Sequence, residues 1–341
     1  MKSSFTLTLC IIIKDGGSGL SDTIMSAAHY IDELILVDNS TRHLTFSIAN
    51  AYNATLLRMP PPFSYPEALQ AAVKEASCDW ILLLDEGDRI EPSSPTSLSL
   101  LHSQPAATSF CCKRITSEPD HSVTAETVSV LFQNSPHLHR QLSFLTQAPL
   151  HSDAAENRTQ LRPFTIYRSV SLAQLQLQVD QMKQQTSHPD LPYWAAMLQY
   201  YKGEYFLAID ALLKALPLMV KDSIYTSHAR VRLAQSYLLM QQFEPCLEAV
   251  EQALLLDPDY PDLHYVRGAA YLGLEQWDAA AAALLQCAAS CSMTHYYISD
   301  CDIDPIACYR LAASCYNRNQ AVENMMELMD LVLSNCTLSA K

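Results

Sequence analysis

SCDWILLLDEGDRI, residues 77–90, places a cluster of acids directly after an apolar run. The run 80–84 contains no polar residue, which is typical of a strand buried on both faces of a parallel sheet. Asp85, Glu86 and Asp88 follow within four residues. Ligands of open parallel sheets bind beyond the carboxyl ends of the strands. The stretch therefore predicts a metal and nucleotide site at a strand end, with a solvated turn as the alternative.

Strand and helix patterns alternate on the N-terminal side of this stretch. We expect strands at 5–13, 33–40, 54–59 and 80–88, and helices at 20–31 and 64–76. This alternation predicts an open, mostly parallel sheet with helices on both faces. The expected strand ends carry charged residues, so polar groups converge at one edge of the sheet. These residues are Lys14, Asp15, Asp38, Asp85 and Asp88.

The second half of the chain repeats itself. The copies are YYKGEYFLAIDALLKAL (200–216), YLLMQQFEPCLEAVEQAL (237–254) and YLGLEQWDAAAAALLQCA (271–288), with a weaker fourth at 311–333. An aromatic residue, Tyr205, Phe243 or Trp277, is followed by small residues three and ten positions later. We expect each copy to be a helix pair whose small residues let the helices approach closely. Stacked pairs bury an apolar face that one pair cannot bury alone.

Composition excludes several classes of protein. The 341 residues carry 22 basic and 36 acidic side chains, a net charge of −14 with no basic stripe, which argues against nucleic-acid binding. No apolar run reaches the roughly 18 residues of a membrane span, and the run 5–13 is interpreted as a buried strand rather than a signal peptide. None of the 11 cysteines forms a C-x-x-C pair, so we expect buried thiols in a reducing cytoplasm.

Three N-terminal segments carry a resemblance to a known family. LTLCIIIKD (7–15), IDELILVDNST (31–41) and FSYPEALQAAVKEASCDWILLLDEGDRI (63–90) resemble family 2 glycosyltransferases with the GT-A nucleotide-sugar fold. The aromatic spacing near 34 resembles the tetratricopeptide repeat, and a bacterial subgroup of the family carries such repeats after the transferase domain. The implied fold class is α/β followed by all-α: a GT-A-like domain at 1–170, a helical linker at 171–190 and a repeat solenoid at 191–336.

The resemblance also implies site residues. In the family, an acid after the first strand and an aspartate after the second contact the base and ribose of the nucleotide. Lys14, Asp15 and Asp38 take this nucleotide-binding role by resemblance. Asp85 joins them at the end of the fourth strand, and Asp85 and Asp88 are the implied ligands of Mn²⁺ or Mg²⁺. Such a cation would stabilise the charge that grows on the departing nucleoside diphosphate.

The chain departs from the family pattern at several positions. Gly87 stands where the Asp-x-Asp motif has its second aspartate, and Leu69-Gln70 stands where the family has Arg-Asn. Residues 14–16 read Lys-Asp-Gly instead of Lys-Asn-Glu, and no His-Glu pair follows 128–140.

The general base has no distinct signature in the sequence. An inverting transferase needs a carboxylate that takes the proton of the acceptor hydroxyl. Asp153 and Glu156 are the candidates by position, and the histidines His137, His139 and His151 are alternatives.

Two functions are compatible with these residues. The first is a cytoplasmic, metal-dependent transferase that moves a sugar from a nucleoside diphosphate sugar, such as a UDP-sugar, to an acceptor, with repeats that bind a protein partner or the acceptor. The second is a catalytically inactive glycosyltransferase-like scaffold beside a peptide-binding repeat domain. A carboxylate pair able to hold a metal would distinguish the first from the second.

Overall fold

The computed structural model of the chain describes residues 6–13, 19–38, 44–59, 65–92, 109–135, 158–159, 164–183, 190–219, 223–291, 297–300 and 303–318. The chain divides into two compact units. Unit 1 consists of Met1–Ser117 and Ala125–Ser169, and unit 2 consists of Glu118–Thr124 and Val170–Lys341.

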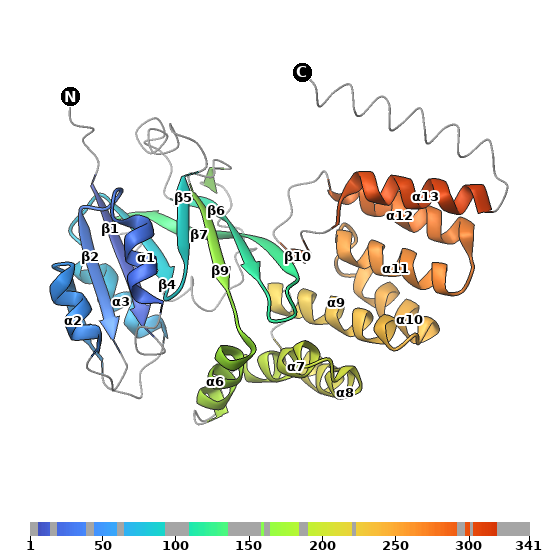
Figure 1. Cartoon of the computed structure of the whole chain (residues 1–341), viewed down its shortest axis with the longest axis horizontal. Helices are drawn as coiled ribbons and strands as arrows, with labels where there is room; N and C mark the ends of the chain where they lie inside the picture. The colour runs from blue at the N-terminus through green and yellow to red at the C-terminus, as the bar shows by residue number, and fades with distance from the viewer. Residues whose placement is uncertain are drawn as a thin grey trace, which may run out of the picture. The chain divides into compact units, whose positions relative to one another are not determined.

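Unit 1 is built on a sheet whose first four strands are parallel (Figure 1). They are β1 (Leu7–Ile13), β2 (Glu33–Asp38), β3 (Thr55–Arg58) and β4 (Trp80–Asp85), arranged in the order β3-β2-β1-β4. The connecting helices are α1 (Leu20–Ala27), α2 (Leu44–Ala51) and α3 (Tyr65–Glu75). The predicted alternation is confirmed, and α2 is an element that the sequence patterns did not reveal.

Helices cover both faces of the sheet because β1 is apolar on both sides. Leu9 and Ile11 pack in one buried cluster with Leu20 and Ile24 of α1. Cys10 and Ile12 point the other way and pack with Ala68, Leu69, Ala72 and Val73 of α3. This period of two sends successive side chains to opposite cores. Leu69, at the position of the family's arginine, is therefore a core residue of α3.

The sheet continues beyond β4 with strands that the sequence did not predict. They are β5 (Arg89–Pro92), β6 (Ser109–Ser117), β7 (Val123–Gln133), β8 (Arg158–Thr159) and β9 (Phe164–Ser169). The order runs β4-β7-β6-β9-β5, with β7 antiparallel to β4 and β5 antiparallel to β9. The strand expected at 80–88 therefore ends at Asp85, and Arg89 begins a separate strand. The sheet is mixed, with a parallel half that begins at β3.

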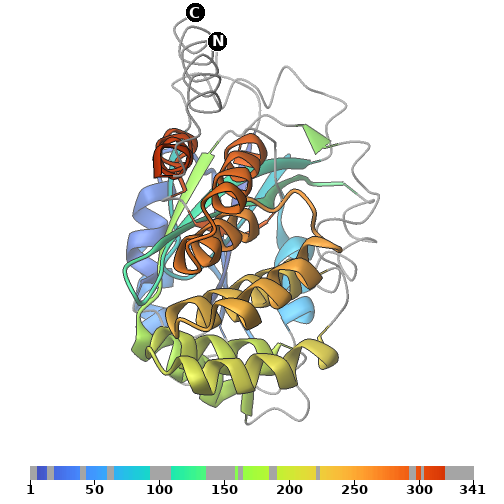
Figure 2. The same ribbon diagram turned by 90° about the vertical axis from the view of Figure 1, so that its right-hand side faces the viewer.

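Unit 2 is a stack of helices (Figures 1 and 2). They are α6 (Leu172–Lys183), α7 (Leu191–Tyr201), α8 (Tyr205–Ala215), the 3₁₀ turn η3 (Leu216–Leu218), α9 (Ile224–Leu239), α10 (Phe243–Leu254), α11 (Pro261–Gly273), α12 (Trp277–Cys291) and α13 (Pro305–Arg318), with the short strand β10 (Ser299–Asp300) before α13. Each helix packs on the next from α6 to α13, and the colours in Figure 2 follow this order from green to red.

The repeat pattern corresponds to real helix pairs. Tyr205, Phe243 and Trp277 begin the second helix of successive pairs. The small residues that follow them, Ala208, Cys246, Ala280, Ala215, Ala253 and Cys287, are all buried. A Cβ on Gly273, at the end of α11, would lie 2.3 Å from the Phe243 ring. The aromatic residue of one pair thus packs on the next pair.

The stretch predicted as a linker is partly helical. Leu175 and Val179 of α6 pack with Leu198 of α7, which joins α6 to the repeat stack. Among the helices in the described ranges, none has both the length and the apolar character needed to cross a bilayer.

Candidate functional site

Two aspartates flank the carboxyl end of the central strand β1. Ile13 is in register with Asp38 of β2, and Ile12 is in register with Asp85 of β4. Because neighbouring strands lie about 4.8 Å apart, the backbones at Asp38 and Asp85 are roughly 10 Å apart across β1. The chain winds outward from β1 to β3 and then returns to β4 on the other side of β1. The ends of β1 and β4 therefore form the switch point at which such sheets bind ligands.

Only some of the predicted nucleotide-binding residues lie in the described part of the chain. Lys14 and Asp15 lie outside the described residues, so their roles stay predictions. Asp38 is 4% exposed, and its carbonyl oxygen accepts a hydrogen bond of 3.1 Å from the amide of Met59. Arg58, in register with Asp38 on β3, brings a guanidinium group to the same edge. Nothing in the sequence pattern singled out Arg58.

The acids after β4 form a tight turn. The amide of Asp88 donates to the carbonyl oxygen of Asp85 at 3.1 Å, and Gly87 has a φ of +92°. A positive φ at the third residue is typical of type II turns and favours glycine. The amide of Gly87 donates to Thr23 Oγ1 at 2.9 Å, which ties the turn to α1. Gly87 therefore provides the backbone conformation that the turn needs. It stands at the position where the family has a metal-binding aspartate.

An arginine holds the two predicted metal ligands together. Arg168 of β9 donates from Nε to Asp88 Oδ1 at 2.7 Å and from Nη2 to Asp88 Oδ2 at 2.9 Å. The same Nη2 lies 2.7 Å from Asp85 Oδ2. Arg114 of β6 approaches Asp88 at 3.9 Å and pairs with Glu126 of β7 at 3.1 Å. We call these five residues the carboxylate–arginine cluster.

Burial and charge reinforce this cluster. The Asp88 side chain is completely buried, and its Oδ2 also accepts from the amide of Asp85 at 3.1 Å. Burial lowers the pKa of Arg168, but Asp85 and Asp88 outweigh it and raise that pKa well above its ordinary value. The guanidinium therefore stays charged at any physiological pH. The acid cluster at residues 85–88 is thus an ion-paired turn in which Asp88 is buried and the other residues are half-buried.

This arrangement does not fit a divalent cation. Mg²⁺ and Mn²⁺ prefer oxygen ligands at close range in near-octahedral geometry. Asp88 uses both oxygens on Arg168, and Asp85 Oδ2 is bound to the same guanidinium. Across the part of the chain that the structure describes, no group of three or more His, Cys, Asp or Glu side chains could hold a metal. The ligands predicted at Asp85 and Asp88 bind an arginine instead.

The predicted general bases cannot be placed. Asp153 and Glu156 lie outside the described residues, and so do His137, His139 and His151. Their roles stay predictions. Gln70, beside the buried Leu69, is exposed on α3.

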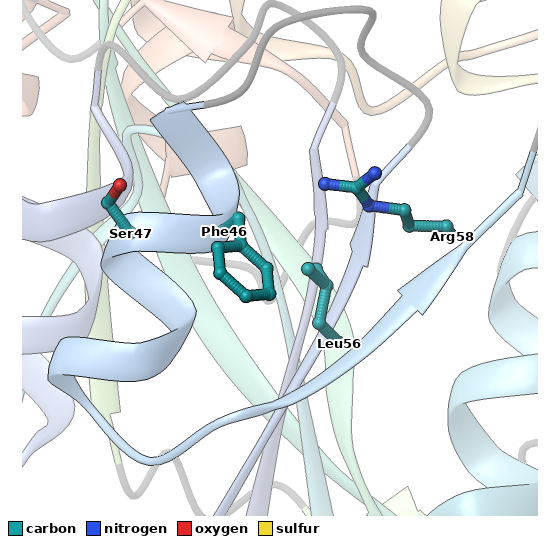
Figure 3. A pocket seen from close by; sticks show the side chains of 4 residues that line it. All are labelled: Phe46, Ser47, Leu56 and Arg58. Carbon is teal, nitrogen blue, oxygen red and sulfur yellow. The ribbon is translucent and has the colours of Figure 1, made fainter.

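A shallow hollow of about 630 Å³ lies at the β3 edge of the sheet. Phe46 and Ser47 of α2 line it together with Leu56 and Arg58 of β3. Figure 3 shows the Phe46 ring and Leu56 facing the same space, with Arg58 at its upper side. The hollow thus begins beside the strand end that carries Asp38.

Unit 2 has its own buried polar cluster, which the sequence did not reveal. Arg232 of α9 is 2% exposed and donates to Gln235 Oε1 at 2.7 Å and to Asp300 Oδ1 at 3.3 Å. Its guanidinium lies 5.0 Å from the centre of the Tyr200 ring. The amide of Asp300 donates to Asp262 Oδ1 at 2.8 Å, so two carboxylates share this region.

This second cluster predicts that unit 2 loses stability as the pH rises. Burial and the nearby Asp300 raise the pKa of Asp262 to about 7, although the Asp300 amide and Arg232 oppose the shift. The folded state therefore keeps a proton that the unfolded state releases near pH 4. Stability is full below pH 4 and declines by on the order of 1–3 kcal/mol as the pH rises through about 7.

The measurement is urea unfolding between pH 4.5 and 8, comparing the wild type with Asp262→Asn. The buried histidines His228 and His264 have lowered pKa values and produce the opposite slope in both proteins, so only the difference between the proteins is informative. Parallel profiles would contradict the assignment to Asp262.

A model of glycosyl transferase family 2 matches residues 8–165. A TPR repeat-containing protein of Synechococcus elongatus is 30% identical over 135 residues, which are 40% of this chain and 33% of that protein. The match with this curated relative thus spans 33% of the relative's length.

Solved structures give more distant likenesses. MamA from Desulfovibrio magneticus RS-1 is 21% identical with a TM-score of 0.34, covering 48% of this chain and 84% of that chain. Glucosyl-3-phosphoglycerate synthase from Mycobacterium tuberculosis, in complex with Mn²⁺, UDP and phosphoglyceric acid, is 19% identical with a TM-score of 0.27, covering 34% and 44%. S. aureus TarS is 12% identical with a TM-score of 0.34, covering 68% and 54%. At TM-scores this low, the likenesses add nothing about the chemistry of this chain.

Proposed function

We propose that the chain transfers a sugar from a nucleoside diphosphate sugar to an acceptor. The proposal starts from residues 8–165, which belong to glycosyl transferase family 2. The supporting observation is the position of Asp38 and Asp85 on either side of the β1 end, at the switch point of the parallel half of the sheet. A carboxylate there accepts hydrogen bonds from the hydroxyls of a ribose or from the N–H of a base.

The donor in this proposal is a UDP-sugar. Asp38, with Lys14 and Asp15 beyond the end of β1, contacts the base and ribose, and Asp85 lies nearer the diphosphate. Transfer proceeds by one in-line displacement, in which the acceptor hydroxyl attacks the anomeric carbon and the nucleoside diphosphate leaves. The proton of that hydroxyl goes to a carboxylate base, for which Asp153 and Glu156 remain the candidates.

The repeats are proposed to bind a protein partner or the acceptor. The support is three exposed apolar side chains of α8: Phe206 is 70%, Leu207 48% and Leu213 51% exposed. Large apolar side chains gathered on one helix are typical of interaction surfaces.

Calorimetry with UDP and a UDP-sugar tests the site. We expect the wild type to bind UDP, and Asp38→Asn to bind at least about tenfold more weakly because the amide cannot replace a charged acceptor. Asp22→Asn is the control, since the Asp22 side chain is exposed and pairs with the exposed Arg89. Absence of UDP binding at millimolar concentration would rule the proposal out.

A second candidate is a scaffold that binds nucleotide without turnover. It is favoured by Gly87, whose turn geometry leaves no carboxylate at the family's second aspartate position. Release of UDP from a UDP-sugar, measured with the same protein preparation, separates the candidates: binding without release favours the scaffold.

A further inference from the structure

Arg168 has more hydrogen-bond donors than the carboxylates use. A guanidinium carries five N–H groups in a planar fork. Nε and Nη2 take both oxygens of Asp88 and one of Asp85. Within the described residues Nη1 has no hydrogen-bond partner, and the side chain is 24% exposed. The Nε–Nη2 edge of the guanidinium therefore binds the turn, and the N–H groups of Nη1 can donate to a ligand.

Arg168 already binds the carboxylates at which a divalent cation was expected. The carboxylates of Asp85, Asp88 and Glu126 face the guanidinium groups of Arg114 and Arg168. One net negative charge remains among the five. A divalent ion at the Asp85–Asp88 pair would have to displace Arg168 and leave that guanidinium without partners. Removing one partner of a buried ion pair is costly because the other charge stays buried.

We propose that the Arg168 guanidinium stands where a divalent cation would bind between Asp85 and Asp88, and that its Nη1 donates to the diphosphate of the nucleotide. Donor binding at this site is then independent of metal. The exclusion of the cation rests on the cluster alone, whereas the contact with a diphosphate rests on the proposed function.

Arginine has the properties that this role requires. It is always charged, and its planar fork binds carboxylates and phosphates at short distance. A fixed positive charge beside a departing diphosphate stabilises the developing negative charge without reorganisation. Arg168 reaches this position because the turn residue Asp88 holds it in place at the end of β4. Asp88 is in this view a positioning residue for Arg168.

The first experiment measures Mn²⁺ binding by the electron paramagnetic resonance of free Mn²⁺. We expect the wild type to leave the free signal unchanged up to about 1 mM, since a pair of carboxylates bound to an arginine makes a poor hard-cation site. Stoichiometric binding below about 0.1 mM would overturn the proposal.

The second experiment measures UDP affinity in EDTA and in Mn²⁺. Equal affinity in both, within about twofold, is expected for the wild type, and an increase of about tenfold or more with Mn²⁺ would overturn the proposal.

Arg168→Lys keeps the charge but loses the planar fork of the guanidinium, and we expect it to weaken UDP binding about tenfold or more in both media. Arg89→Lys is the matched control, since Arg89 is exposed and follows Asp88 directly; we expect a change of less than about twofold. Arg168→Lys at wild-type affinity would refute the phosphate contact.

The two experiments distinguish failure of this inference from failure of the proposed function. If UDP does not bind in any medium, the proposed function fails, together with the diphosphate contact. The exclusion of the cation is still decided by the Mn²⁺ titration of the wild type, which needs neither nucleotide nor a variant.

Discussion

Replacement of Asp88 by alanine is expected to lower the free energy of unfolding of unit 1 by about 3–5 kcal/mol, the cost of breaking a buried ion pair from one side. The Asp88 side chain is completely buried and accepts from Arg168 and from the amide of Asp85. Alanine would remove the acceptor of the Arg168 Nε–H and the Oδ2 acceptor of that amide. It would also remove the carboxylate that positions Arg168.

Urea unfolding followed by circular dichroism measures the effect, and hydrogen exchange locates it. We expect amides of β4 and β9 to exchange faster, because Arg168 joins these strands through Asp85 and Asp88. Asp22→Ala is the control: the Asp22–Arg89 pair lies on the surface, so its loss should cost less than about 1 kcal/mol. Equal losses in the two variants would show that the cluster contributes nothing beyond a surface ion pair.

Replacement of Arg232 by methionine is expected to lower the free energy of unfolding of unit 2 by about 2–4 kcal/mol. Methionine keeps much of the volume of the side chain but leaves Asp300 without its cation, and it removes the shorter of the two hydrogen bonds that Gln235 Oε1 accepts. The contact of the guanidinium with the Tyr200 ring is lost as well. The range extends down to about 2 kcal/mol because Asp300 is partly exposed, so water hydrates its carboxylate when the arginine is gone.

Thermal unfolding, with hydrogen exchange of α9, measures this second effect. The control is Lys214→Met, which removes a surface charge that pairs with Asp210 one turn away on α8. That pair is worth at most about 0.5 kcal/mol. A loss for Arg232→Met that is no larger than the control would mean that the buried cluster of unit 2 is energetically neutral.

The parts of the fold that the sequence predicted are those with a strong local period. The apolar run of β1 sends alternate residues to two cores, and its pattern is visible without any knowledge of the partners. The repeat is equally visible, because Tyr205, Phe243 and Trp277 recur at the start of the second helix of each pair. Strand β6 escaped prediction because its polar and apolar residues mix without a clear alternation.

The sequence predicted that acids gather at the strand ends, but it did not predict the arginine that binds Asp85 and Asp88. Asp38 and Asp85 follow apolar strands, so their position at one edge follows from the pattern. Their surroundings do not, because Arg168 lies 80 residues after Asp88 in the chain. Gly87 looked like a lost ligand, whereas its φ of +92° shows a turn that requires glycine.

The sequence by itself determined the order of the parts: a parallel α/β sheet with acids at its strand ends, then stacked helix pairs. It could do so because strand burial, helix pairing and repeat length are local properties of a chain. Only the tertiary structure decided that Asp85 and Asp88 bind an arginine and that Arg232 is buried beside Asp300. Ion pairs between distant residues leave no periodic trace in a sequence, and their meaning depends on which charges the fold brings within about 4 Å of one another.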